Sequence, residues 1–243
     1  MNRATFFDAI RPLFGGLSKD QVRGLEILLA AVDGLPIKHQ AYVLATAFHE
    51  TARTMQPVRE TQAKTDAEAA RRLERAWKAG KLPWVKTPYW RADVHGKHWI
   101  GRGYVQLTHR DNYERAGKRM GVDLVSDPSA AMSPMLAARI IVQGMSEGWF
   151  TKVKMADCAT YRNMRQVVNG MDRADMIAGY AVKFEAALAM AEVQPPRPDV
   201  EPAGPSVQKM HKSPGNTQKP HNAMIAAIVT VIAALAAYLG VWK

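Results

Sequence analysis

The sequence has a single cysteine and lacks several kinds of segment that would assign it to a familiar class. Because Cys158 has no second cysteine to pair with, an intrachain disulfide is excluded, and the fold must be held by its core. Such a chain is compatible with a reducing cytoplasm. The N-terminus has no apolar run before Asp8, so we expect no secretory signal peptide. No long alternation of apolar and polar residues is present, which argues against an extended β-sheet.

Acidic residues are in the minority, with 22 Asp and Glu against 33 Lys and Arg, for a net charge of +11. Such a charge favours polyanions: nucleic acid, anionic lipid or an acidic cell-wall polymer. The basic residues are scattered along the chain rather than gathered in one stripe, and no nucleic-acid-binding module is recognisable. We therefore expect no nucleic-acid partner.

Composition divides the chain into three parts. Residues 1–194 have the mixture of apolar and polar residues typical of a globular domain, while residues 195–222 hold seven of the chain's 14 prolines and almost no apolar side chains. This second part predicts an extended linker. Residues 223–242 are uncharged and mostly apolar, and 20 residues in a helix would span about 30 Å. We therefore predict a C-terminal transmembrane helix, with Tyr238 and Trp242 at the membrane interface.

Apolar spacing in residues 1–194 is mainly helical. A capping box of Ser18 and Gln21 begins one helix, which Gly34 ends, and Pro36 begins a second that we expect to run to about Arg53. Further helices are predicted over residues 66–78, 134–150 and 173–192. Residues 83–108, rich in Gly, Pro and aromatic residues, predict a long loop or small hairpin. The expected fold class is therefore all-α, with one irregular segment.

Glu50 is the first residue whose position indicates chemistry. It extends the apolar side of its helix and lies near the helix C-terminus, where the carbonyl ends disfavour a negative charge. Both effects would raise its affinity for a proton, as a general acid requires. The preceding His49 invites comparison with the zinc-binding pattern His-Glu-x-x-His, but the fifth position is Arg53. We expect no metal and no cofactor.

Glu60 is the second candidate. It follows Pro57, so we expect it on a loop across from Glu50, surrounded by water and ionised, as a general base for a nucleophilic water. Gln106 and Thr108 are alternate residues of an extended segment, so their side chains would share one side and hold that water or a sugar hydroxyl. The competing interpretation makes each glutamate an ordinary surface residue in an ion pair with a neighbouring arginine.

Three motifs in order carry a resemblance. They are Ala-Phe-His-Glu-Thr at 47–51, Gly-Arg-Gly-Tyr-Val-Gln-Leu-Thr at 101–108 with Asn112 and Tyr113 after it, and Val-Val-Asn-Gly at 167–170. Over about residues 41–180 the chain resembles the family 19 glycoside hydrolases, the chitinase-like lysozymes, and within them the phage endolysins that cleave peptidoglycan. The resemblance implies a bilobal, mostly helical, lysozyme-like fold and inversion at the anomeric carbon.

The resemblance also implies roles for single residues. Glu50 matches the general acid, Glu60 the general base, and Gln106 and Thr108 the residues that hold water. The full set of predicted substrate-binding residues is His49, Tyr104, Gln106, Asn112, Asn169 and Arg173. Loop lengths vary in the family, so Glu68 or Glu74 are alternatives to Glu60 as the base.

The chain departs from the family pattern in three places. Ala52 replaces a hydroxyl residue, Tyr104 replaces a proline, and Met176 stands where the last helix has an arginine, for which Arg173 is a substitute. These differences weaken the case for crystalline chitin as substrate. Aromatic and basic residues from Trp84 to Trp99 either line the substrate cleft or clamp the loop onto the core, and both interpretations stay open.

The function that these patterns favour is an endolysin-type peptidoglycan hydrolase. It would act as a monomer on the β-1,4 bond between N-acetylmuramic acid and N-acetylglucosamine, anchored in the host bacterial inner membrane. The lysines before the predicted membrane helix place the N-terminal domain in the cytoplasm, opposite to where a wall enzyme acts, so its orientation is undetermined. The alternatives are a chitinase acting on N-acetylglucosamine polymers and a non-catalytic, membrane-tethered wall-binding protein.

Overall fold

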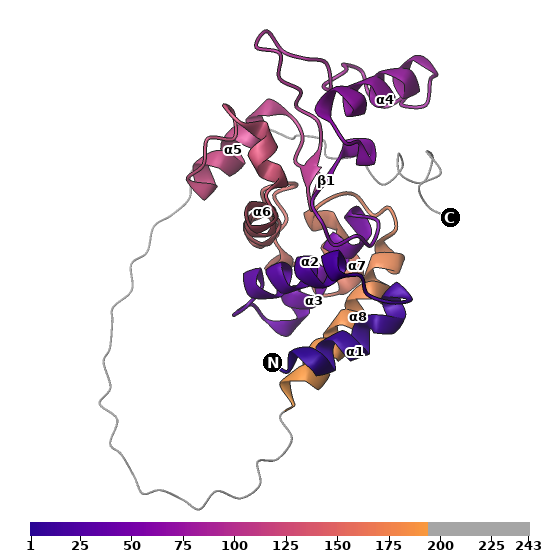
Figure 1. Ribbon diagram of the computed structural model, residues 1–243, viewed down its shortest axis with the longest axis vertical. Coiled ribbons are helices and arrows are strands. Elements are labelled where there is room, and N and C mark those ends of the chain that lie inside the picture. Colours follow the sequence, from indigo (N-terminus) through magenta and orange to yellow (C-terminus); the bar gives the residue numbers. More distant parts are fainter. Residues whose placement is uncertain (194–243) are drawn as a thin grey trace, which may run out of the picture.

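The computed structural model describes residues 1–193, which are mainly helical, as the sequence predicts (Figure 1). In chain order the α-helices are α1 (Arg3–Phe14), α2 (Lys19–Ala31), α3 (Ile37–Glu50), α4 (Asp66–Lys78), α5 (Arg110–Met120), α6 (Pro134–Glu147), α7 (Tyr161–Met164) and α8 (Ala174–Glu192). The short 3-10 helices are η1 (Glu60–Gln62), η2 (Pro128–Met132), η3 (Met155–Asp157) and η4 (Arg165–Val167), and the strands are β1 (Val58–Arg59) and β2 (Arg102–Gly103).

The beginning of α2 shows how local sequence sets a helix boundary. The Ser18 hydroxyl accepts from the Gln21 amide, and the Gln21 side chain accepts from the Ser18 amide, so the predicted capping box is complete. One turn later Gly24 lies so close to the next segment that a Cβ atom there would be 1.8 Å from the Met55 carbonyl oxygen. Only glycine allows this approach, which brings α2 against the chain that leaves α3.

Helix α3 ends at Glu50, three residues before the predicted end at Arg53. The backbone turns left-handed at Ala52 (φ 51°) and Arg53 (φ 68°), so the α-helical hydrogen bonds cannot continue. The chain then reverses towards β1. The early end places Glu50 in the last helical turn, beside the turn that leads to Glu60.

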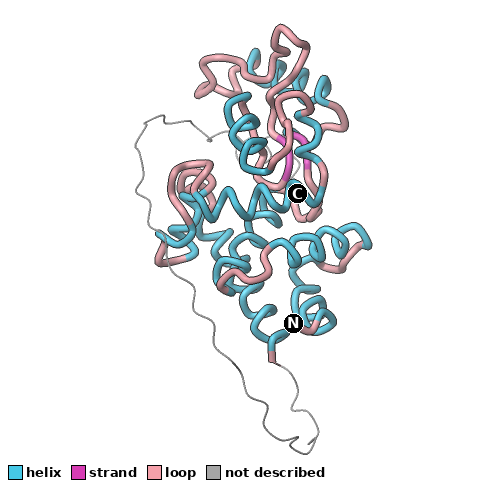
Figure 2. Tube along the Cα trace, turned by 90° about the vertical axis from the view of Figure 1, so that its left-hand side faces the viewer, coloured by secondary structure: helices cyan, strands magenta, loops and turns pink. Residues whose placement is uncertain are grey.

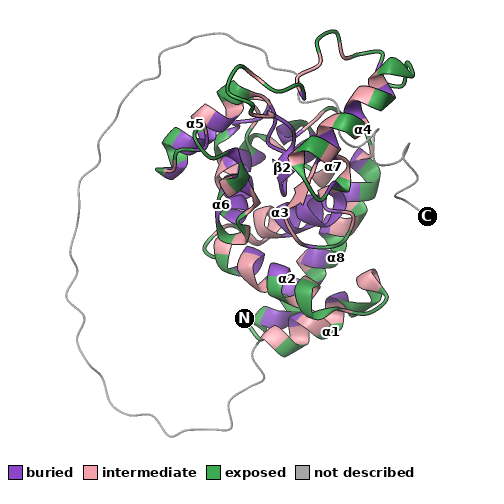
Figure 3. Cartoon of the chain, turned by 45° about the horizontal axis from the view of Figure 1, so that its top comes forward, coloured by how far each residue is buried: buried purple, intermediate pink, exposed green. Residues whose placement is uncertain are grey.

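The described residues build two hydrophobic cores of unequal size. The larger core takes residues from α1, α2, α3, α5, α6 and α8, and residues 41–49 of α3 are all buried in it (Figure 3). The smaller core joins α4 to residues 82–100 through Leu73, Leu82 and Trp90. In Figures 1 and 2, α4 and the loops beside it extend from one end of the helical body. We call residues 59–100 the small lobe and the rest of residues 1–193 the large lobe.

A two-stranded antiparallel sheet joins the lobes. Val58 pairs with Gly103, and Arg59 pairs with Arg102. The segment 83–108, predicted as a loop or hairpin, is therefore a loop with one very short strand, and this strand pairs with β1 from outside the segment. This pairing brings the Gly-Arg-Gly turn next to the chain between Glu50 and Glu60.

The predicted membrane anchor requires a correction. None of the helices in residues 1–193 is long and apolar enough to cross a bilayer. Among them the longest is α8, whose 19 residues include Asp175, Lys183 and Glu185. The predicted linker at 195–222 and the predicted membrane helix at 223–242 lie outside the described residues. The predicted single-pass anchor in the host inner membrane is therefore wrong for the described structure, because its helices supply no membrane span.

Candidate active site

Glu50 is held by Arg165, an arginine outside the three family motifs. Its carboxylate is 6% exposed, and Oε1 accepts from Nη1 of Arg165 at 2.8 Å. Arg165 is 1% exposed and also donates from Nε to the Asp172 carbonyl at 3.0 Å. Its Nη2 has no hydrogen-bond partner within residues 1–193. A buried ion pair with one donor left over gives Glu50 a fixed orientation and leaves a hydrogen-bonding group beside it.

A signal for Arg165 was present in the sequence. The residue stands four positions before Asn169, at the edge of the Val-Val-Asn-Gly motif. Spacing alone does not pair it with Glu50, which is 115 residues earlier in the chain. Arg173, the predicted substitute for the family arginine, is partly buried at the N-cap of α8 and lies 3.7 Å from the Asp172 carboxylate.

His49 shares the surroundings of Glu50. Its side chain is buried, and this burial lowers the pKa of the imidazole; nearby Glu50 raises it and Arg165 and Arg173 lower it further. A neutral imidazole next to the ion pair acts as a hydrogen-bonding group rather than as a second cation. His49, Glu50, Arg165 and Arg173 therefore form one cluster, built from the ends of α3, η4 and α8.

Glu60 occupies a different environment from the expected one. We predicted a hydrated, ionised loop carboxylate, whereas the residue is 1% exposed. Oε2 accepts from the Gly101 amide at 2.8 Å, and Oε1 accepts from the Tyr89 hydroxyl. Burial raises the pKa of Glu60, and the bonds from Gly101 and Tyr89 oppose that rise. The expectation is wrong because Glu60 follows β1 directly, and pairing of β1 with β2 buries it against Gly101 and Tyr89.

The two alternative bases serve the small lobe instead. Glu68 accepts from the Lys64 amide and pairs with Arg72 at 2.6 Å. Glu74 accepts from the Trp90 indole and pairs with Arg91 at 2.9 Å, and these bonds lower its pKa to about 2. Both carboxylates are occupied by neighbours that hold α4 to its loop.

The turn at 101–108 fixes the chain between the two glutamates. The Tyr104 hydroxyl donates to the Met55 carbonyl at 3.1 Å, and the Gln106 amide donates to the Val58 carbonyl at 3.0 Å. Both side chains are buried, as is Thr108, whose backbone carbonyl accepts from Asn112 at 2.8 Å. In this structure Tyr104 and Gln106 contact backbone, where we had predicted contact with water or sugar.

Seven of the nine non-glycine residues with positive φ in the described part lie next to these motifs. They are Ala52, Arg53, Met55, Thr61, Gln62, Gln106 and His109. Each such residue costs on the order of 1–3 kcal/mol, and this strain persists only where surrounding contacts enforce it. Strained backbone at both glutamates and at the Gly-Arg-Gly turn is typical of a functional site. Asn169 is not among these residues, and its Oδ1 accepts from the Gly170 amide at 2.8 Å.

The aromatic loop of the small lobe mainly clamps itself onto the core. Trp90 is fully buried, and Tyr89 packs against His109 with ring centroids 4.8 Å apart. His109 directly follows Thr108, and burial lowers its pKa. Tyr89 thus joins Glu60 to the end of the Gly-Arg-Gly turn.

The Tyr89 hydroxyl gives a test of the Glu60 environment. Tyr89→Phe keeps the ring but removes a donor to the carboxylate, so we expect the pKa of Glu60 to rise further. A carboxyl whose pKa is raised by folding leaves stability intact below its ordinary pKa and reduces it as pH climbs through the raised value. The variant should therefore lose about 1.5–3 kcal/mol at pH 8 and much less at pH 4.

Urea unfolding at the two pH values measures this difference. Tyr104→Phe is the matched control, because its hydroxyl donates to a neutral carbonyl and its loss should not depend on pH. Equal losses at pH 4 and pH 8 for Tyr89→Phe would show that the hydroxyl does not stabilise a charged Glu60.

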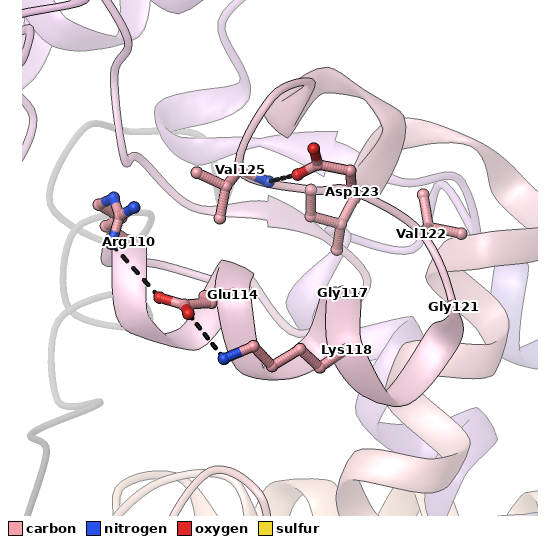
Figure 4. A pocket seen from close by; sticks show the side chains of 9 residues that line it. Arg110, Glu114, Gly117, Lys118, Gly121, Val122, Asp123 and Val125 are labelled. Atoms are coloured by element: carbon pink, nitrogen blue, oxygen red, sulfur yellow. Dashed lines mark hydrogen bonds and ion pairs between the residues drawn. The ribbon is translucent and has the colours of Figure 1, made fainter.

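Neither metal binding nor the pocket beside α5 involves this cluster. No group of three or more His, Cys, Asp or Glu side chains in residues 1–193 is arranged to hold a metal ion. A pocket of about 450 Å³ lies between α5 and the turn after it, where Glu114 pairs with Lys118 at 2.7 Å and with Arg110 at 3.3 Å (Figure 4). It contains none of the predicted site residues.

Known proteins resemble part of the chain. Residues 77–170 match the family model described as chitinase class I. Acidic endochitinase pcht28 of Solanum chilense is 47% identical over 47 residues, which are 18% of this chain and 19% of that protein. Chitinase 11 of Oryza sativa subsp. japonica is 44% identical over 45 residues, 18% of each protein. The chain thus spans about a fifth of the length of these curated relatives.

Solved structures of two bacterial chitinases are also similar. Chitinase C from Streptomyces griseus HUT6037 has 17% identity and a TM-score of 0.48, with 78% of this chain and 76% of that chain covered. A bacterial family 19 chitinase has 18% identity and a TM-score of 0.48, with 80% and 96% covered. The match to the family model at residues 77–170 includes the Gly-Arg-Gly turn, so this part of the chain is similar to the family 19 glycoside hydrolases.

Proposed function

We propose that the chain is a glycosidase that hydrolyses β-1,4 bonds in an N-acetylglucosamine-containing polysaccharide. The observation that carries this proposal is the Glu50 cluster: a carboxyl at the end of a buried helix, oriented by Arg165 and flanked by a strained turn. A general acid needs such a fixed position beside the bond that it protonates.

In this mechanism Glu50 protonates the glycosidic oxygen, and a second carboxyl directs water to the opposite face of the sugar. Glu60 is our candidate for that role. Thr108 would assist it, because Thr108 belongs to the turn that begins at Gly101, the hydrogen-bond partner of Glu60. Glu60 is 1% exposed and both of its oxygens accept hydrogen bonds, so the role of general base requires the Tyr89 side of the carboxylate to open to water. An inverting reaction predicts carboxyl groups roughly 6.5–9.5 Å apart once substrate is bound.

The substrate that the sequence relatives favour is a chitin-type polymer, since the two curated matches are named as chitinases. Peptidoglycan is the second candidate, and the net charge of +11 favours it because its peptide stems carry carboxylates. Its backbone contains the same N-acetylglucosamine unit. The non-catalytic alternative was a membrane-tethered wall-binding protein, and the described helices supply no such tether.

Product analysis separates these substrates. We expect the full chain to shorten chitin hexamer, with mass spectrometry reporting the products and NMR reporting α-anomers at the new reducing ends. Purified peptidoglycan is digested in parallel, with Glu50→Gln as the blank for both. Cleavage of peptidoglycan alone would select the second substrate, and cleavage of neither polymer by the wild type would refute the proposal.

A further inference from the structure

The net positive charge of the protein is concentrated in the small lobe. Residues 59–97 contain ten Lys and Arg against five Asp and Glu, a net charge of +5. The whole of residues 1–193 contains 28 against 20, a net charge of +8. One fifth of the described chain thus holds most of its excess charge.

The acidic residues of the small lobe are already engaged. Asp66 pairs with both Arg59 and Arg102, and Glu60 is buried beneath Tyr89. As described above, Glu68 and Glu74 pair with arginines of their own lobe. No ion pair within 4.0 Å is formed by Arg71, Arg75 or Lys86 in residues 1–193, although the charge of Arg71 contributes to lowering the pKa of Glu68. Lys78 reaches Glu74 only at 3.8 Å.

The cations of α4 without a close acidic partner lie on one face of the helix. Arg71, Arg75 and Lys78 follow the spacing i, i+4, i+7, which places them on one side of the helix. The buried residues Ala69, Leu73 and Ala76 are on the opposite side. We call Arg71, Arg75 and Lys78 the α4 basic face. It points away from the small core, and α4 lies at the edge of the molecule (Figures 1 and 3).

The loop that follows α4 carries an exposed aromatic residue. Trp84 is 45% exposed, and its loop is fixed to α4 because the Trp77 indole donates to the Val85 carbonyl at 3.0 Å. Lys86 follows on the same loop. An indole that remains this exposed offers an apolar plane on which a sugar ring can stack. Exposed cations on α4 and an exposed indole on the loop that is bonded to α4 together suit a charged glycan, which offers both carboxylates and sugar rings.

The α4 basic face is also rigidly connected to the candidate active site. Arg72 donates to the Thr61 carbonyl at 2.7 Å, directly after Glu60, and Asp66 at the start of α4 binds Arg59 of β1 and Arg102 of β2. A polymer bound along α4 is therefore held at a fixed distance from Glu60 and its neighbours.

We propose that the α4 basic face binds the carboxylates of an anionic glycan, such as the peptide-substituted wall polymer that is the second candidate substrate. This inference rests on the proposed glycosidase function for its biological meaning, but its physical content is a binding site. Single exposed ion pairs contribute little, whereas three cations fixed on one face bind a polymer with repeated charges.

A binding experiment in an inactive background tests the site apart from catalysis. Full-length Glu50→Gln protein is sedimented with purified peptidoglycan sacculi or with colloidal chitin at low and at high salt. The face variant adds Arg71→Gln, Arg75→Gln and Lys78→Gln. The control variant adds Lys19→Gln, Arg139→Gln and Lys183→Gln, three exposed cations of the large lobe. Both triple variants lower the net charge of +11 by three.

We expect the face variant to bind sacculi about tenfold more weakly at low salt, and the control variant to bind nearly as well as its parent. Binding to chitin should be equal for all three proteins. Equal weakening in both triple variants would mean that bulk charge alone drives binding and would overturn the proposal, as would no weakening in either. Tighter, face-dependent binding to double-stranded DNA than to sacculi would assign the face to nucleic acid and also overturn it. Circular dichroism melting confirms that each variant is folded.

Discussion

Glu50→Gln is expected to lower the rate of polysaccharide hydrolysis by about 10²–10⁴-fold, because positioned general acids contribute factors of that size. Glutamine keeps the shape of the side chain and its carbonyl can still accept from Arg165, but it has no proton to donate to a leaving oxygen. The measurement is the initial rate of reducing-end formation on the substrate that the product analysis identifies.

The chain offers a matched control for this substitution. Glu147 is also the last residue of a helix and also pairs with an arginine, since it lies 2.9 Å from Arg119 of α5, but that pair is exposed. Glu147→Gln should leave the rate unchanged. If Glu50→Gln retained full activity while remaining folded, Glu50 would not be the acid, and the proposed mechanism would fail even if the chain were a glycosidase.

Arg165→Met should be the most damaging substitution for stability, with a loss of about 3–5 kcal/mol in the free energy of unfolding at neutral pH. The loss arises because the Glu50 carboxylate would be left buried without its partner, while methionine fills most of the space of the arginine stem. Urea unfolding of the purified protein measures it. Arg119→Met, which breaks the exposed pair with Glu147, should cost less than about 1 kcal/mol.

A double substitution separates the ion pair from packing. Glu50→Gln combined with Arg165→Met removes both charges, so we expect it to be more stable than Arg165→Met alone. A double variant as unstable as the single one would show that Arg165 stabilises through its bond to the Asp172 carbonyl and its packing. In that case the arginine would not be responsible for the orientation of Glu50.

Local sequence was sufficient for the helices and for one half of the site. The capping box of Ser18 and Gln21, and helical spacing over residues 66–78, predicted boundaries that the structure has, because caps and periodicity act over a few residues. The placement of Glu50 at the buried end of α3 followed from the same short-range pattern. The end at Arg53 was missed because left-handed backbone at Ala52 depends on contacts from outside the helix.

Tertiary structure decided which groups meet. Arg165 reaches Glu50 across 115 residues, and Tyr89 reaches Glu60 across 29. Neither sequence separation matches the repeat of a helix or a strand, so no sequence pattern predicts these contacts. Each contact forms when separate elements pack together. Glu60 appeared solvent-facing because Pro57 predicts a loop, yet pairing of β1 with β2 buries it. Sequence alone was therefore sufficient for the hypothesis of two catalytic glutamates. Their burial, their partners and the position of the α4 basic face opposite the small core were decided by the fold.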